Sequence, residues 1–296
     1  MAFIRSFASA LILSALPLCL GACGSAARSP SPEQPRANQP RFATLAASEE
    51  RTAAALANWK AVVGEQAAAA APAPELRPVT ATLAALPAGL ADYPRLPLVV
   101  IDKDEKAQSE EETRESLRRF LATAAPLLGV DLKQLSLVGV TDAPAGGGAR
   151  RATYRQDPFA YPLRNGYGVV EVTFTPDLRV VGLSSTAVPN AEPLARTLAA
   201  VPKTLTGEQA AAALANRVVT YTDRAGAQQT RTLAQVEPTA ARQLVVVPVR
   251  RETGGGALEL HVAWEVAAGG AGAPLSVYVD AATGDVLGAE AGRAGL

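Results

Sequence analysis

The chain has 296 residues, and 48% of them are hydrophobic, which is enough for one large core or two small ones. Its 28 basic and 28 acidic side chains balance, so charge gives no reason to expect a nucleic acid as partner. The single histidine, His261, and the two cysteines are too few for a zinc site of the usual type, and we expect neither a metal nor another cofactor.

Residues 1–22 have the features of a secretory signal. Arg5 supplies a positive charge, and the apolar run from Phe7 to Leu20 is shorter than the ~20 residues that a helix needs to cross a bilayer. The run ends in Leu20-Gly21-Ala22-Cys23, which resembles the lipobox of bacterial lipoproteins. The resemblance implies cleavage before Cys23, acylation of its thiol, and membrane attachment in the cell envelope. An ordinary signal peptide with a chance cysteine is the alternative.

Two consequences follow for the processed chain. Cys19 leaves with the leader, so that no internal disulfide is possible. Gly24 follows the lipobox cysteine where an Asp would be a retention signal, which favours the outer membrane in a cell with two membranes. Residues 23–41 are rich in proline, serine and charge, and we expect a flexible tether.

The next segment, residues 42–74, is predicted to be a helical spacer. Leu45, Leu56 and Trp59 share one face of a helix from Thr44 to about Ala70, which prolines then end.

Residues 75–190 are predicted to be a first small domain. Tyr93 to Ile101 is extended and apolar, and a helix follows from Glu110 to Ala125, where Pro126 and Gly129 should end it. An alternating pattern then predicts antiparallel strands at Leu135–Val138, Thr153–Gln156, Gly168–Thr175 and Arg179–Ser185.

Residues 203–290 are predicted to be a second domain, after a proline-punctuated connection from Ala187 to Lys203. Its helix begins with a Thr206 and Gln209 capping box and continues through QAAAALANRVV. The predicted strands are Gln243–Val249, Leu258–Val266, Leu275–Asp280 and Val286–Ala289. The fold class is therefore α+β, with a helix packed on an antiparallel sheet in each domain and a tail at 291–296.

The first domain resembles the fungalysin/thermolysin propeptide (FTP) domain. The matching residues are Gln156, the stretch Ala160-Tyr161-Pro162-Leu163, Gly166 and the strand Val169–Phe174. Ala160 stands where that family has a glycine in a tight turn.

The second domain resembles a PepSY domain. The resemblance rests on the helix entry at 206–210, the strand 260–266 with Trp264, and the stretch from Val277 to Leu287. Within that stretch, Asp280 and Thr283 can bond turn backbone and Gly284 can supply a positive φ. We interpret Trp264 as a core aromatic residue.

Together the two resemblances imply a protease propeptide without its metallopeptidase domain, since no H-E-x-x-H motif occurs. We expect a non-catalytic inhibitor or folding modulator of a secreted zinc metalloprotease; a cell-envelope binding module without a protease partner is the alternative. An enzyme would need a nucleophile and base, a metal or a carboxylate pair, and no such pair stands out. His261 is interpreted as a residue of a strand face, because the sequence shows no partner for it.

Overall fold

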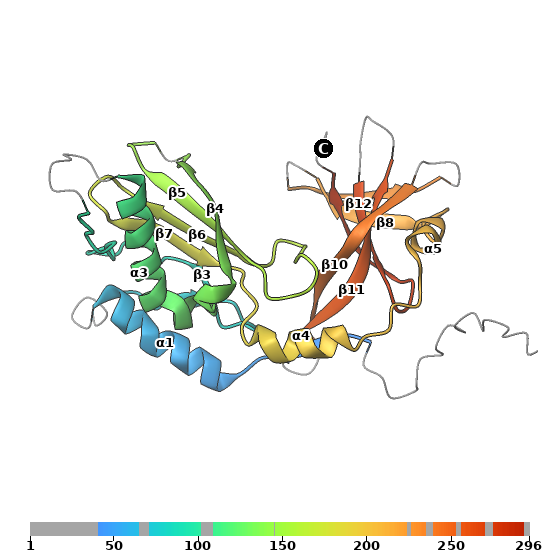
Figure 1. Ribbon diagram of the computed structural model, residues 1–296, viewed down its shortest axis with the longest axis horizontal. Helices are drawn as coiled ribbons and strands as arrows, with labels where there is room; N and C mark the ends of the chain where they lie inside the picture. The colour runs from blue at the N-terminus through green and yellow to red at the C-terminus, as the bar shows by residue number, and fades with distance from the viewer. Residues whose placement is uncertain are drawn as a thin grey trace, which may run out of the picture. The chain divides into compact units, whose positions relative to one another are not determined.

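The computed structural model describes residues 41–64, 71–101, 109–144, 146–223, 226–234, 239–252, 256–269 and 275–292 (Figure 1). The predicted signal, the lipobox at Leu20, Gly21, Ala22 and Cys23, and nearly all of the tether lie outside them. The fold class is α+β, as the sequence predicts: a four-stranded and a seven-stranded sheet, each with helices on one face.

The segment predicted to be a helix from Thr44 is different in the structure. Strand β1 (Ala43–Ala46) pairs antiparallel with β11 (Ala257–Ala268), and helix α1 (Glu49–Val63) begins only after Ser48, whose Oγ accepts from Arg51 N. This strand could not be predicted from the local sequence, because its pairing partner is more than 200 residues away. Helix α1 buries Ala55 and Trp59 in the core that it shares with α3 (Glu110–Leu128), so it is a packing helix.

The four-stranded sheet is an antiparallel meander. Its strands are β4 (Leu135–Asp142), β5 (Arg150–Gln156), β6 (Val169–Phe174) and β7 (Val180–Ser185). All four predicted strands are therefore present, and the first two are longer than predicted. Val170, Val172 and Phe174 alternate with half-buried residues on β6 and pack with α3, which explains the period of two in the sequence. The short strands β2 (Glu75–Leu76) and β3 (Leu83–Ala85) pair nearby, and a 3₁₀ turn, η1 (Leu132–Gln134), precedes β4.

Helix α3 passes through Pro126, where the sequence predicted its end. The side chain of Asn58, on α1, donates to Thr123 O (3.0 Å) and accepts from Leu127 N (3.1 Å), so it satisfies backbone groups on both sides of the proline. Gly129, in the left-handed conformation, then ends the helix as expected.

The seven-stranded sheet is built around β11. Its strand order is β1-β11-β12-β13-β8-β9, and β10 pairs with β11 along its whole length. The strands not yet located are β8 (Val218–Thr222), β9 (Gln228–Thr232), β10 (Thr239–Arg251), β12 (Leu275–Asp280) and β13 (Val286–Ala291). Since a strand has two edges, β1 and β12 share the edge of β11 opposite β10.

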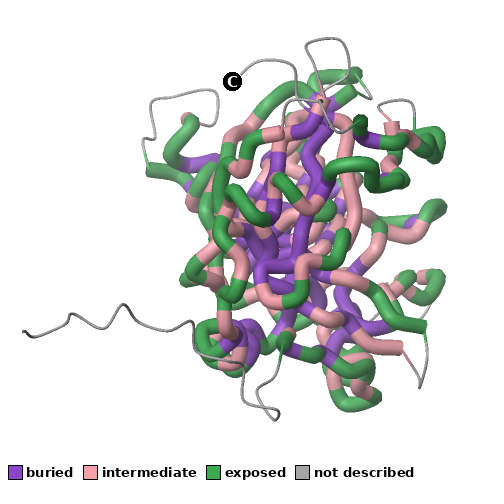
Figure 2. Tube along the Cα trace, turned by 90° about the vertical axis from the view of Figure 1, so that its right-hand side faces the viewer, coloured by how far each residue is buried: buried purple, intermediate pink, exposed green. Residues whose placement is uncertain are grey.

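Two helices cover one face of this sheet. Helix α4 (Ala191–Ala199) lies where the sequence predicted an irregular connection, and it buries Leu194 and Leu198 against β11 residues. Helix α5 (Gly207–Ala212) has the predicted capping box of Thr206 and Gln209. It ends earlier than predicted, because a turn at Asn216 leads into β8, and neither β8 nor β9 was predicted. Figure 2 shows the buried residues gathered in the interior, with exposed residues around them.

Candidate functional site

Strand β11 presents different chemistry on its two faces. Leu258, Leu260, Val262 and Val266 pack in the cores beneath α4 and α5. The residues between them are Glu259, His261, Ala263 and Glu265, and they face the other way. On an antiparallel sheet such a second face is commonly solvated. Here His261 is 5% exposed and Glu265 7% exposed, so this face is buried, and its polar groups lie beside an apolar cluster of Val245, Val247, Ala263 and Tyr278.

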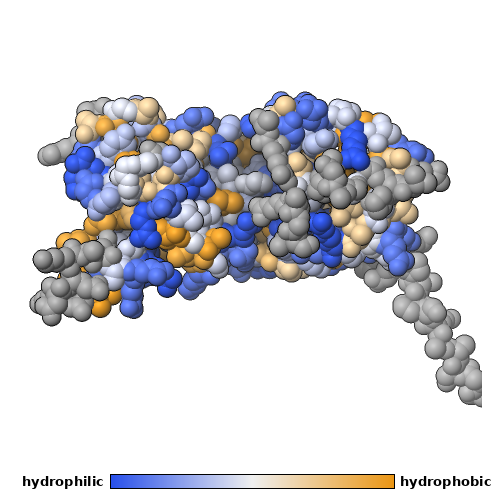
Figure 3. All heavy atoms as spheres, turned by 90° about the horizontal axis from the view of Figure 1, so that it is seen from above, coloured by the Kyte–Doolittle hydropathy of each residue, from blue (hydrophilic) through white to orange (hydrophobic). Residues whose placement is uncertain are grey.

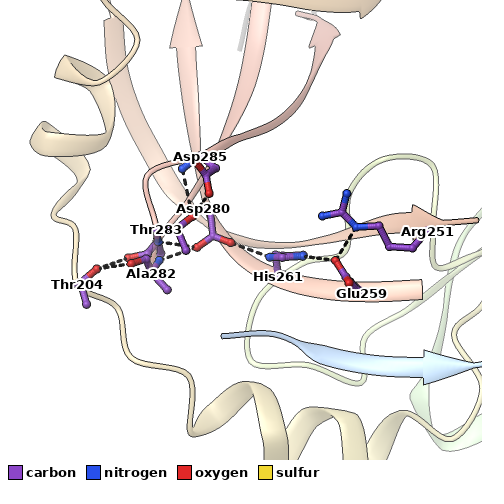
Figure 4. Close-up of polar contacts among 9 residues, drawn as sticks. Thr204, Arg251, Glu259, His261, Asp280, Ala282, Thr283 and Asp285 are labelled. Atoms are coloured by element: carbon purple, nitrogen blue, oxygen red, sulfur yellow. Dashed lines mark hydrogen bonds and ion pairs between the residues drawn. The ribbon is translucent and has the colours of Figure 1, made fainter. Parts of the chain in front are cut away.

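His261 lies between two carboxylates on this face (Figure 4). Its Nδ1 is 2.7 Å from Asp280 Oδ2, and its Nε2 is 3.4 Å from Glu259 Oε2. The ring of Phe42 packs against the imidazole with 4.8 Å between centroids. The interpretation of His261 as a strand-face residue is right in position, but its premise of having no partner is wrong. The partner Asp280 lies on β12, which only the fold brings next to β11.

Asp280 also organises the turn between β12 and β13. Its Oδ1 accepts from Ala282 N (2.7 Å) and Thr283 N (3.0 Å), and Gly284 has a φ of 80°. Thr283 Oγ1 accepts from Asp285 N. The predicted roles of Asp280, Thr283 and Gly284 in this turn are thus present. The hydroxyl of Thr204 donates to Ala282 O in the same turn. Asp280 therefore connects His261 with the segment that enters α5.

Glu259 extends the network to the surface. Arg251 Nε donates to Glu259 Oε2 at 2.8 Å, and both side chains are drawn in Figure 4. Burial opposes ionisation of Glu259, but hydrogen bonds from Arg251 and His261 outweigh it, and the pKa of this carboxyl lies below its usual value. The network therefore runs from an exposed cation through a carboxylate and an imidazole to the buried Asp280.

Glu265 is the second buried carboxylate of this face. Arg164 donates to Glu265 Oε2 from Nε (3.2 Å) and from Nη2 (3.1 Å), and Gln243 Nε2 donates to the same oxygen (3.0 Å). Arg164 comes from the loop between β5 and β6. The ion pair therefore links the four-stranded sheet's loop to the seven-stranded sheet, as do two backbone bonds between residues 162–164 and Val246 of β10.

A polar cleft of about 820 Å³ opens beside this ion pair. Tyr278, 2% exposed, lies in its wall, and burial together with the charge of Glu290 raises the pKa of its phenol. Most of the other residues around the cleft carry cationic, carboxylate, amide or small side chains or belong to the 162–167 loop. They include Arg155, Pro162, Arg164, Gly166, Arg242, Gln243, Glu265, Ser276 and Glu290.

Apart from the turn residues, the predicted motif residues are distributed over three places. Pro162 and Gly166 line the cleft, and Pro162 O accepts from Val246 N at 2.9 Å. Gln156 is fully buried, and its amide pairs with the backbone of Val188 in both directions. Trp264 lies on the helix-covered face, where Nε1 donates to Leu205 O. It is only partly buried, so it borders the core rather than filling it.

Sequence reasoning missed Glu265, Arg164 and Tyr278. The signal for Glu265 was present, since a glutamate at the end of the alternating run from Leu258 to Val266 shares a face with His261. Nothing local to Arg164 indicates its partner, because the two residues are separated by 101 positions.

Among the described residues, no group of three or more His, Cys, Asp or Glu side chains could hold a metal ion. None of the helices described is long and apolar enough to cross a membrane.

Comparison with known proteins gives a weak structural neighbour. No family model and no curated protein matches the chain. Among solved structures, the Bacillus megaterium YpeB C-terminal domain is a weak neighbour, with 14% sequence identity and a TM-score of 0.28. The match covers 65% of this chain and 70% of that one, and a likeness at this level carries no functional inference.

Proposed function

We propose that this protein is a non-catalytic polypeptide-binding module of the cell envelope, held to a membrane through a lipid on Cys23. We propose further that it acts in trans as a propeptide-like inhibitor or folding modulator of a secreted thermolysin-like metalloprotease. The observation that carries the proposal is the cleft beside the buried Arg164–Glu265 ion pair. On the same sheet face, the contacts of His261, Asp280 and Glu265 hold the sheet, the turn and the loop together.

The state of His261 supports a binding role. A general base must reach the proton that it abstracts. Both ring nitrogens of His261 already face carboxylates, and Phe42 covers the ring. The single histidine of the sequence therefore has a structural role.

The edge of β10 supports a polypeptide as the ligand. Residues 162–164 lie along this strand and exchange two backbone bonds with Val246, as an added strand would. Leu244, two residues away, directs its backbone to the same edge, where no hydrogen bond to it is present among the described residues. The adjoining cleft holds Arg155 and Arg242, which suit acidic or carbonyl groups of a bound chain.

An inhibition assay tests the proposed function. The chain from Gly24 onward is titrated against a thermolysin-like protease and against the zinc proteases secreted by the host. We expect inhibition that weakens on Arg242→Glu and is unchanged by Lys133→Glu, an exposed cation outside the cleft. If the chain inhibits none of these enzymes at micromolar concentration, the proposed role as a protease inhibitor is contradicted.

The lipobox motivates the alternative role of an envelope-binding module without a protease partner. Co-purification of the tagged, membrane-extracted chain distinguishes the two, since a reproducible partner other than a protease supports the alternative.

The lipid anchor on Cys23 is tested separately. Labelled palmitate should be incorporated into the wild-type chain and not into Cys23→Ser, and equal incorporation would contradict the lipobox.

A further inference from the structure

The outer edge of β10 is only partly paired within the described part of the chain. Val246 exchanges two backbone bonds there with residues 162–164. Two residues further on, Pro248 O accepts from Asn165 Nδ2 at 3.1 Å. Backbone groups that point to one edge recur every second residue, so Leu244 is the next such position in the other direction. Its N–H and C=O have no hydrogen bond among the described residues, and they are free to pair with an added strand.

Pro162 explains why the chain's own segment does not pair with Leu244. Residues 162–164 run parallel to β10 at Val246. If this parallel pairing continued for two more residues, residue 162 would donate its N–H to Leu244 O. A proline has no N–H, so the pairing ends there. The backbone also bends at residues 159–161, which takes the preceding chain out of the line of the strand.

The open edge leads into the cleft of about 820 Å³. Gln243, the neighbour of Leu244, lines the cleft, and so does Pro162. A strand added parallel to β10 at Leu244 would therefore point its carboxyl end towards Pro162. It could not continue along the edge, because residues 162–164 already occupy the backbone of Val246. A strand added in the opposite direction would place its amino end there instead.

The charges of the cleft favour the carboxyl end. The charged residues that line the cleft are Arg155, Arg164, Arg242, Glu265 and Glu290. Arg164 pairs with Glu265, and the hydroxyl of Tyr278 donates to Glu290. No hydrogen bond or ion pair to Arg155 or Arg242 is present in the part of the chain that the structure describes. The excess charge is thus positive, which suits a terminal carboxylate better than a terminal ammonium group.

Ser276 adds a donor that has no acceptor. It lies on β12, shares the sheet face of Tyr278 and lines the cleft, and it is 7% exposed. Its hydroxyl makes no hydrogen bond to any described residue, although a polar group this well buried normally has a partner. Figure 3 shows hydrophilic residues along the whole length of the face that it draws. Polarity alone therefore marks no site, whereas these unpaired groups distinguish the cleft.

We propose that the open edge of β10 and the cleft bind the carboxyl-terminal end of an extended polypeptide. The last residues of this ligand pair with Leu244 as a parallel strand, and Arg155, Arg242 and Ser276 hold its terminal carboxylate. The ligand class is a protein or peptide whose carboxyl end is exposed and extended. The inference rests on the polypeptide-binding part of the proposed function, and it does not depend on a protease partner.

Paired peptide pools test the recognition of a carboxyl end. Random ten-residue peptides are prepared with a free carboxyl end and, from the same mixture, with a carboxamide end. Each pool is passed over the immobilised full chain, purified in detergent. We expect the free-acid pool to be retained about tenfold more strongly, since the carboxamide loses charge-assisted hydrogen bonds. Bound peptide should also slow the amide exchange of Leu244.

Arg242→Gln tests where the carboxylate binds. We expect it to lower retention of the free-acid pool about tenfold and to leave retention of the carboxamide pool unchanged. The matched control is Arg196→Gln, because Arg196 is an exposed arginine of α4 outside the cleft, and it should preserve the preference. Ser276→Ala, with an unchanged circular dichroism spectrum, should lower retention of the free-acid pool about threefold.

The contrary results separate the inference from the proposed function. Equal retention of both pools by the unaltered chain would overturn recognition of the carboxyl end and leave polypeptide binding intact. Retention of neither pool would overturn both. A preference for the free acid that survives Arg242→Gln would place the carboxylate outside the cleft. Amide exchange at Leu244 that bound peptide leaves unchanged would exclude pairing with β10, and either result would overturn the inference.

Discussion

Glu171 on β6 and Glu265 on β11 occupy comparable positions, each on the sheet face that the helices leave uncovered. Glu171 has a side chain that is 40% exposed and lies 3.8 Å from Arg151. Glu265 has a side chain that is 9% exposed and lies 3.1 Å from Arg164, with a further bond from Gln243. The four-stranded sheet leaves its second face to water, whereas the seven-stranded sheet buries polar groups there. A buried polar face contributes stability only while every partner stays in place.

The largest effect should follow from removal of Asp280. Asp280→Ala leaves His261 Nδ1 and the amides of Ala282 and Thr283 without their acceptor, and we expect a loss of about 4 kcal/mol in the free energy of unfolding. Urea denaturation measures it. Asp280→Asn retains an acceptor for the two amides and should lose less than half as much. Glu171→Ala on the other sheet should change stability by less than about 0.5 kcal/mol. Similar losses for Asp280→Ala and Glu171→Ala would remove the distinction between the two faces.

The next effect should follow from separating the buried ion pair. Arg164→Ala leaves the carboxylate of Glu265 with Gln243 alone, and we expect a loss of about 3 kcal/mol. The matched change, Arg151→Ala, should cost less than about 0.5 kcal/mol. Because Arg164 belongs to the loop of the four-stranded sheet, we also expect faster amide exchange at Val246. Protection of Val246 that survives Arg164→Ala would show that the backbone bonds hold the loop without the ion pair.

The core of the four-stranded sheet gives a prediction in alkali. Burial raises the pKa of Tyr154 to about 12, against about 10 in an unfolded chain. Below pH 10 the phenol is protonated in both states and the full stability is present. Above pH 10 the unfolded chain loses the proton first, so stability falls as pH rises towards 12, by about 1.4 kcal/mol at pH 11. Tyr154→Phe should reduce the loss between pH 9 and pH 11 by that amount in urea titrations. An unchanged pH slope would contradict this.

How much of each region the sequence could predict follows from where its partners lie. The strands of the four-stranded sheet could be predicted because the residues that pack against α3 are the ones that alternate with polar residues in the sequence. The Asp280 turn and the Thr206 cap are also legible, since their bonds join residues at most five positions apart. Strand β1, the pair of Arg164 with Glu265 and the acceptor of His261 are not, because each depends on a residue that only the complete fold brings near. Polar β9 has no apolar alternation to reveal it, whereas β8 does alternate, but its first two residues, Val218 and Val219, were assigned to the preceding helix.

The smallest effect concerns the same distinction within the helices. The α5 cap is local, whereas the continuation of α3 past Pro126 involves the amide of Asn58 on another helix. Asn58→Ala should cost about 1 kcal/mol, because Leu127 N and Thr123 O lose their partner. Asn58→Asp keeps the acceptor for Leu127 N and loses only the donor, so its cost should be smaller. Amide exchange at Leu127 separates the two variants: it should accelerate in Asn58→Ala and stay slow in Asn58→Asp. Equal acceleration in both would show that packing of α1 on α3, and not the amide bridge, carries the helix through its proline.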